Sequence, residues 1–228
     1  MRIRPVGAHA LLLDFTASPA EPAHLRSAGL AAAPQPAAEV AALVEAWRAE
    51  LWRRRDRGDL VATEIVPAAA TVLLDGVPDP VATADRIAGW TPPSPATTAP
   101  ADADLTEVPV TYDGEDLPRV AEHWRTDVPG VLRQLRQTEF RVAFCGFAPG
   151  FGYLTGLPAE LAVPRLPTPR TRVPAGSVAL AGPYAGIYPT ASPGGWLLVG
   201  RTALTLFNPH AHPPALLTPG LRVRLAAA

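Results

Sequence analysis

Hydrophobic positions over residues 1–90 alternate between the period of strands and the period of helices. A short apolar run from Ala10 to Phe15 predicts a buried strand. Further along, large apolar residues follow the i, i+3, i+4, i+7 spacing of an amphipathic helix that ends near Gly58. These residues are Val40, Leu43, Val44, Trp47 and Leu51.

Two more strands and a second helix complete this first group of elements. We expect the strands at residues 62–66 and 71–74 and the helix at residues 79–88. The residues expected on the inner face of that helix are Val81, Ala84, Ile87 and Ala88. Strand, helix, strand, strand, helix and room for a last strand give the order of a ferredoxin-like α+β sandwich, which we predict for residues 1–90.

The hydrophobic period then disappears. Residues 91–104 are rich in Pro, Ala and Thr, a composition typical of a semi-rigid surface linker, so we place the domain boundary there. The second domain, residues 105–228, begins with a strand at 106–112 and a helix at 117–125. A second helix is expected from Pro129, with Val131, Leu132 and Leu135 facing inward.

From Phe140 to the end, the pattern predicts many short strands that close into a barrel. Residues 197–199, 204–207 and 221–225 are among the expected strands. The fold class is therefore α+β, a ferredoxin-like sandwich followed by a β-barrel.

Composition sets limits on function. Of the 228 residues, 48% are hydrophobic and 18% charged, as in soluble globular proteins, and the net charge of −1 provides no field that attracts nucleic acid or an anionic membrane. Every basic residue is Arg, so the chain has no Walker A lysine and no Schiff-base lysine. Neither a signal peptide nor a membrane-length apolar segment is visible, and we expect a cytoplasmic protein.

Metal and thiol chemistry are not expected. Cys145 lies in an apolar strand pattern, which favours a small buried residue over a nucleophile. His210 and His212 have a spacing suited to metal binding, but they lie in a proline-bounded loop without a third ligand nearby.

The region from Phe144 to Arg201 is dense in Gly, Pro and Arg, and it carries most of the functional information. Between residues 141 and 209 a single acid, Glu160, accompanies five arginines: Arg141, Arg165, Arg170, Arg172 and Arg201. One interpretation is an anion site, because Arg forks and Gly-rich turns both bind carboxylate or phosphate. The other is that these arginines pair with acids elsewhere. Glu115 and Asp116 are likewise either a functional carboxylate pair or part of a solvated turn.

The ordered segments GFAPGF, TPRTRVPAGSV, GIYP and SPGGW make this region similar to the allophanate hydrolase subunit 1 family. The resemblance implies a cyclophilin-like barrel for the second domain. It also implies a subunit of ATP-dependent 5-oxoprolinase, which opens 5-oxoproline to glutamate using ATP and its accompanying Mg²⁺. The implied partners are a C-type subunit, similar to allophanate hydrolase subunit 2, and an A-type (LamB/YcsF-like) subunit. A KipI-like inhibitor of a sensor histidine kinase and a component of urea or allophanate metabolism are the alternatives.

The resemblance also implies site residues. Arg170 and Arg172, two positions apart on a strand, would share one face and stabilise developing negative charge. Implied contacts to substrate or nucleotide are Phe147, Pro149, Gly150, Tyr153, Ser177, Tyr188, Ser192, Gly194, Gly195 and Trp196. Tyr153, Tyr188 and Trp196 could line a ligand pocket or fill the barrel, and their aromatic character favours core packing. The chain departs from the family pattern at Ala8, Leu135, Leu221 and in Tyr184-Ala185.

Overall fold

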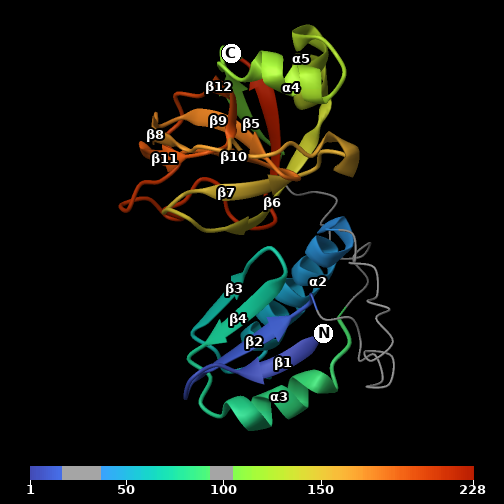
Figure 1. The fold of residues 1–228 in the computed structure, drawn as a ribbon. Coiled ribbons are helices and arrows are strands. Elements are labelled where there is room, and N and C mark those ends of the chain that lie inside the picture. The colour runs from blue at the N-terminus through green and yellow to red at the C-terminus, as the bar shows by residue number, and fades with distance from the viewer. Residues whose placement is uncertain (17–36, 93–104) are drawn as a thin grey trace, which may run out of the picture. The chain divides into compact units, whose positions relative to one another are not determined.

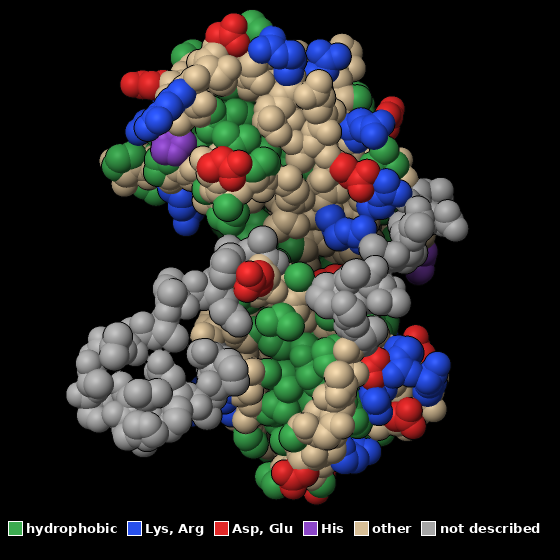
Figure 2. Space-filling view, turned by 90° about the vertical axis from the view of Figure 1, so that its right-hand side faces the viewer, with side chains coloured by type: hydrophobic (Ala, Val, Ile, Leu, Met, Phe, Trp, Pro, Cys, Tyr) green, Lys and Arg blue, Asp and Glu red, His purple; other side chains and the backbone are tan. Residues whose placement is uncertain are grey.

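The computed structural model describes residues 1–16, 37–92 and 105–228, which belong to two compact units, Met1–Ala101 and Asp102–Ala228 (Figure 1). Most of the predicted linker, residues 93–104, lies outside the described residues, as does the segment 17–36 before the first helix. Among the described residues, no helix has both the length and the apolar character needed to cross a membrane. On the face shown in Figure 2, acidic and basic side chains are interspersed over each unit.

The first unit is an antiparallel sheet covered by two helices. Its sheet has the order β1-β2-β4-β3, and one buried cluster joins the sheet to both helices. The elements are β1 (Arg2–Pro5), β2 (Ala10–Asp14), α2 (Ala37–Asp56), β3 (Glu64–Pro67), β4 (Thr71–Asp75) and α3 (Pro80–Ala88). The predicted ferredoxin-like arrangement is confirmed, but the additional strand, β1, precedes β2 instead of following α3.

Helix α3 begins where predicted, and two of its expected inner residues, Ala84 and Ile87, face the core. Asp79 caps it by accepting a hydrogen bond from the Ala82 amide at 3.0 Å, and Pro80 opens the first turn. Thr83 and Ile87, one helical turn apart, are the buried residues. The expected burial of Val81 is wrong, because six positions turn it about 120° around the helix from Ile87. It lies outside the buried face and is 64% exposed. Ala88 is also exposed.

The second unit is a barrel-like sheet with two helices, and the predicted fold class is confirmed. Its seven-stranded sheet has the order β12-β9-β10-β7-β6-β13-β5, with β5 and β13 parallel. The elements are β5 (Leu105–Val110), α4 (Leu117–His123), α5 (Val128–Gln137), β6 (Glu139–Cys145), β7 (Gly152–Thr155), η2 (Ala159–Leu161), β8 (Arg170–Val173), β9 (Ser177–Ala181), β10 (Tyr184–Ile187), β11 (Ser192–Gly194), β12 (Leu197–Arg201) and β13 (Arg222–Ala227).

Two hydrogen bonds link the edge strands of this sheet. Thr111, just beyond β5, and Arg201, at the end of β12, exchange backbone hydrogen bonds of 2.8 and 2.9 Å. The sheet therefore closes on itself at this point, which removes part of its free edge. A separate two-stranded ribbon, β11-β8, lies beside it.

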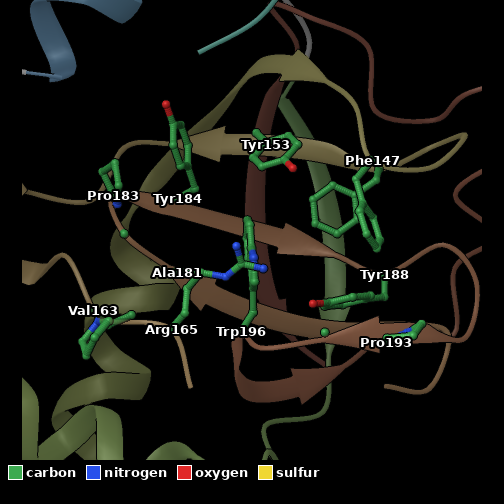
Figure 3. Close-up of a pocket in the computed structure, with 14 residues that line it drawn as sticks. Phe147, Tyr153, Val163, Arg165, Ala181, Pro183, Tyr184, Tyr188, Pro193 and Trp196 are labelled. Carbon is green, nitrogen blue, oxygen red and sulfur yellow. The ribbon is translucent and has the colours of Figure 1, made fainter. Parts of the chain in front are cut away.

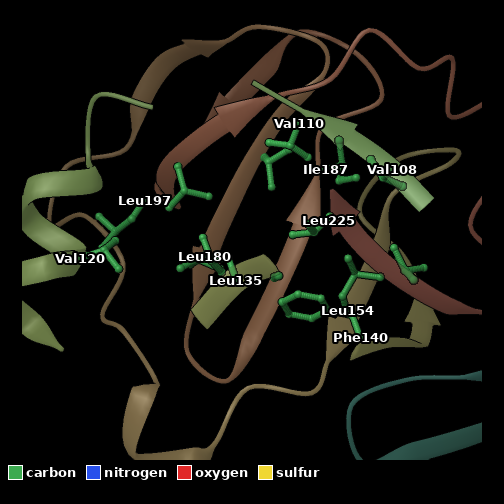
Figure 4. Close-up of a cluster of buried hydrophobic side chains, with 14 of the residues drawn as sticks. Val108, Val110, Val120, Leu135, Phe140, Leu154, Leu180, Ile187, Leu197 and Leu225 are labelled. Atoms are coloured by element: carbon green, nitrogen blue, oxygen red, sulfur yellow. The ribbon is translucent and has the colours of Figure 1, made fainter. Parts of the chain in front are cut away.

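Apolar side chains fill the barrel. Figure 4 shows residues from strands and helices pointing toward one another, among them Val108, Phe140, Leu154, Leu180 and Leu135, all fully buried. The strands contribute alternate residues, as the buried positions of β6 and β13 show, so the period of two in the sequence corresponds to one face turned inward.

The strand expected at residues 204–207 is absent. Only Phe207 forms a β-bridge, to Ala215, and Leu206 is buried without belonging to a strand. The opposing segment contains Pro213 and Pro214, which have no N–H to continue a ladder. Hydrophobicity alone therefore overpredicted regular structure here.

Titration of Tyr112 should lower the stability of the second unit at high pH. Burial raises the pKa of Tyr112 to about 12, and its hydroxyl donates a 3.0 Å hydrogen bond to the Leu225 carbonyl. Since an unfolded tyrosine titrates near pH 10, this stabilisation is complete below pH 10 and is lost as the pH rises toward 12. After allowance for partial exposure, we expect a loss of about 1–2 kcal/mol.

Denaturant unfolding of the protein and of Tyr112→Phe, measured at intervals from pH 9 to 12, checks this expectation. The free-energy difference between the two proteins should narrow or reverse as the pH rises. Parallel pH profiles would contradict it.

Candidate functional site

A pocket of about 410 Å³ opens in the second unit, a size within the range of small-molecule sites (Figure 3). It lies over β7, β9, β10 and the turns that precede β7 and follow β11. Its lining residues are Phe147, Phe151, Tyr153, Val163, Pro164, Arg165, Ala181, Gly182, Pro183, Tyr184, Tyr188, Pro193, Gly194 and Trp196.

The pocket walls are aromatic. Phe151 lies at the centre, with edge-to-face contacts to Tyr188 and Trp196, each with ring centroids 5.4 Å apart. Tyr153 joins this group through Trp196 at 5.6 Å and Tyr184 at 5.6 Å. These rings form a hydrophobic cluster distinct from the main barrel core. Interlocked rings of this kind provide a rigid apolar surface for a ligand.

Two glycines allow the rings to approach the backbone. A Cβ on Gly186 would lie 2.9 Å from Phe151 and 3.0 Å from Trp196. A Cβ on Gly194 would lie within 2.3 Å of the Tyr188 hydroxyl oxygen. The glycines of the GIYP and SPGGW segments therefore make space for the aromatic cluster.

Arg165 supplies the charge of the pocket. It is the one charged residue among the described lining residues, and Figure 3 shows its guanidinium directed into the pocket beside Trp196. Within the described part of the chain, Arg165 forms no ion pair. A cation that has no counterion among the described residues and lies beside apolar walls suits a small ligand that combines a carboxylate with a nonpolar body.

Tyr188 provides a hydrogen-bonding group in the same pocket. Its side chain is 2% exposed, and burial raises the pKa of its hydroxyl despite the opposing effects of Arg165 and of a hydrogen bond with the Trp196 backbone. The hydroxyl therefore keeps its proton at neutral pH. Tyr188 lines the pocket, so this proton can be donated to a ligand oxygen.

Arg170 is held by acids outside the pocket lining. Its Nη2 donates to both carboxylate oxygens of Asp116 at 2.9 and 2.8 Å, and its Nε lies 2.7 Å from Glu115. Asp116 is 7% exposed and also accepts a 2.7 Å hydrogen bond from the Leu198 amide. Arg170 is therefore paired with protein carboxylates, whereas the expected anion clamp requires a guanidinium that is open to a ligand. The interpretation of Asp116 as part of a solvated turn is wrong, because its side chain is buried.

The other arginines of this region do not gather at the pocket, although they lie close together in the sequence. Arg172 is exposed on β8 and does not line the pocket, so the expected two-arginine clamp is not assembled there. Arg201 pairs with Asp113, and Arg141 donates to the Gly220 carbonyl. Acids and carbonyls distant in sequence therefore account for part of the apparent excess of positive charge. Catalytic roles for Arg170 and Arg172 stay a prediction.

Half of the predicted binding residues meet at the pocket, and the others support it or lie apart. Phe147, Tyr153, Tyr188, Gly194 and Trp196 line it. Pro149 and Gly150 are the central residues of a turn closed by the Phe151 amide and the Ala148 carbonyl at 3.0 Å. The Gly195 carbonyl accepts from the Leu166 amide. Ser177 is buried in β9, and the Ser192 hydroxyl is buried without a hydrogen-bond partner in the described structure.

Sequence reasoning missed Phe151 and Tyr184 and did not select Arg165. Phe151 belongs to the GFAPGF segment and Arg165 to the arginine excess, so a signal existed for both. The departures at Leu135 and Leu221 lie away from the pocket lining. Leu135 is fully buried in the barrel core and Leu221 packs against that core, so neither substitution removes a pocket group.

Cys145 and the histidines have no evident place in the site. The Cys145 thiol is half-buried, donates to the Leu217 carbonyl, and has a pKa raised by burial. His210 and His212 are exposed. Among the described residues, no group of three or more His, Cys, Asp or Glu side chains is placed to hold a metal ion.

Relatives support the sequence resemblance. The chain is 48% identical over 121 residues to the B-type subunit of 5-oxoprolinase from Escherichia coli O157:H7, covering 52% of this chain and 56% of the relative. It is 44% identical over 119 residues to the B-type subunit of 5-oxoprolinase from Bacillus subtilis strain 168, covering 51% and 50%. The chain thus matches only about half the length of these curated relatives.

Solved structures show the same fold. TTHA0988 matches with a TM-score of 0.70 and 32% identity over 96% of this chain and 40% of that one. The Kluyveromyces lactis urea carboxylase matches with a TM-score of 0.62 and 18% identity, covering 99% of this chain and 21% of the carboxylase. The profile of the family described as carboxyltransferase domain, subdomain C and D, matches residues 1–217. The chain therefore belongs to that family.

Proposed function

We propose that this chain is the B-type subunit of an ATP-dependent 5-oxoprolinase and that the aromatic pocket binds 5-oxoproline. Relatives named as B-type subunits of 5-oxoprolinase support membership of such an assembly. The observation that carries the substrate assignment is Arg165, an arginine without a described acidic partner in an otherwise uncharged aromatic pocket.

The chemistry of 5-oxoproline matches this arrangement. The molecule has one carboxylate, a small ring with nonpolar methylene groups, and a lactam carbonyl. Arg165 binds the carboxylate through its fork of N–H donors, and the rings of Tyr153 and Trp196 pack against the methylene groups. The Tyr188 hydroxyl donates to the lactam oxygen, where negative charge develops when the ring opens.

The described residues do not by themselves fit a magnesium–nucleotide site. The sequence contains no lysine for a phosphate loop, the described residues contain no acid cluster for a metal, and the pocket has one cationic side chain for a polyphosphate. We propose that a C-type subunit, with an A-type subunit, completes the site for ATP and Mg²⁺. The contribution of this chain is then to bind and orient the lactam.

Co-expression with candidate C-type and A-type subunits tests the proposal. Purified assembly should release glutamate from 5-oxoproline only when ATP and Mg²⁺ are present, and omission of this chain should abolish the release. An intact assembly that releases no glutamate would contradict the enzyme assignment and favour a KipI-like regulatory binder.

A further inference from the structure

Phe147 adopts a backbone conformation that side chains of its size rarely tolerate. Its φ is +67°, and the hydrogen bond from the Ala148 amide to the Gly146 carbonyl, 2.7 Å long, spans this single residue. A positive φ at the centre of an i to i+2 hydrogen bond is the rare, strained form of the γ-turn. Glycine would occupy the position with little strain, yet phenylalanine stands there.

The neighbouring hydrogen bonds hold Phe147 in this conformation. The Gly146 amide donates to the Phe151 carbonyl at 3.1 Å, and the Phe151 amide donates back to the Ala148 carbonyl at 3.0 Å. Pro149 and Gly150, with Gly150 at φ +83°, form the turn between them. The loop is therefore fixed at both ends around Phe147, as expected where a fold maintains strain at a functional position.

Burial of the side chain does not explain why phenylalanine stands at position 147. Its side chain is 62% exposed, although the ring makes edge-to-face contacts with Phe151 at 5.3 Å and Tyr188 at 6.2 Å. Figure 3 shows Phe147 at the rim of the pocket on the side of Tyr188, opposite Pro183 and Tyr184. One ring face thus remains open beside the pocket, where a bound ligand would cover it.

We infer that Phe147 is kept in its strained turn to provide an aromatic contact for the nonpolar ring of a small carboxylate bound at Arg165. Phe147 is then a specificity-determining residue that lowers the stability of the free protein and raises affinity for ring-bearing ligands. The identity of the ligand as 5-oxoproline rests on the proposed function, whereas the role of Phe147 requires only a small carboxylate that carries a nonpolar ring.

Melting temperatures of Phe147→Gly and Phe147→Ala test the strain. Both variants lose the ring, but alanine keeps the Cβ that disfavours positive φ. We expect the glycine variant to melt about 2–4 °C above the alanine variant, the reverse of the usual order. Arg125, at φ +54° and exposed between α4 and α5, is the matched control, and its glycine and alanine variants should show the same order.

Calorimetric titration of the full chain in its assembly tests the contact. The probes are 5-oxoproline, proline, cyclopentanecarboxylate and benzoate. Phe147→Gly and Phe147→Ala should each bind the best probe about tenfold more weakly than the natural chain does. Phe147→Tyr keeps an aromatic ring and should retain the natural affinity, as should Arg125→Gly.

The outcomes separate this inference from the proposed function. If another ring carboxylate binds, 5-oxoproline does not, and the Phe147 substitutions weaken that binding, the inference is supported and the substrate assignment is contradicted. Unchanged affinity in the glycine variant, a glycine variant that melts below the alanine variant, or an assembly that binds none of the four probes overturns the inference.

Discussion

Substitution of Arg165 by glutamine is expected to lower kcat/KM for 5-oxoproline about 10- to 100-fold in the assembled enzyme. The substitution keeps a polar side chain with an N–H donor, although a shorter one, and removes the positive charge that would bind the carboxylate. A charge-assisted bidentate contact is stronger than a neutral hydrogen bond, although exposure of Arg165 to solvent moderates the difference. Because the interaction involves an unreacting part of the substrate, we expect KM to rise more than kcat falls.

Initial rates of glutamate release, measured across a range of 5-oxoproline concentrations, provide both constants. Arg119→Gln is the matched control, because Arg119 is exposed on α4 and does not line the pocket. Arg172→Gln tests the anion clamp expected from the sequence. A loss for Arg172→Gln as large as that for Arg165→Gln, or normal kinetics for Arg165→Gln, would contradict the binding mode.

The sequence predicted those helices and strands that a pattern of a few neighbouring residues defines. The apolar stripe of α2, the proline start of α5 and the apolar pattern of β6 are all visible within a few residues. Strand β1 was missed because its sequence, Arg-Ile-Arg-Pro, belongs to an exposed edge strand and has little apolar alternation. Closure of the barrel depends on hydrogen bonds between Thr111 and Arg201, which no local pattern encodes.

The candidate site shows the same division. Gly194 and Trp196 of the pocket could be selected from the sequence, because both occur in the recognisable segment SPGGW. The roles of the arginines could not be assigned, since Arg170 finds its partner 54 positions away in Asp116 and Arg165 finds none among the described residues. Charge counted along a sequence therefore does not identify which guanidinium remains available to a ligand.

Asp116 connects three parts of the barrel unit. Its carboxylate joins the start of α4 to Arg170 on β8 and to the Leu198 amide on β12, and its own amide donates to the Leu198 carbonyl at 3.0 Å. Glu115 adds a second, more exposed carboxylate to Arg170. Loss of the buried carboxylate would leave both the guanidinium and the Leu198 amide without their main acceptor.

We expect Asp116→Ala to reduce the free energy of unfolding by about 1–3 kcal/mol, because the Leu198 amide loses its acceptor while Glu115 still pairs with Arg170. Urea unfolding followed by near-ultraviolet circular dichroism measures the change. Asp113→Ala is the matched control and should lose less than about 1 kcal/mol, because the Asp113–Arg201 pair is exposed.

Arg170→Gln decides between a structural and a catalytic arginine. If Arg170 serves mainly to neutralise Asp116, the variant should be destabilised, and its effect should be strongly non-additive with that of Asp116→Ala in a double-mutant cycle. A variant that unfolds like the natural chain but no longer supports glutamate release would contradict this account. In that case Arg170 would act on the substrate or nucleotide, and its observed pairing with Asp116 would position the guanidinium for that task.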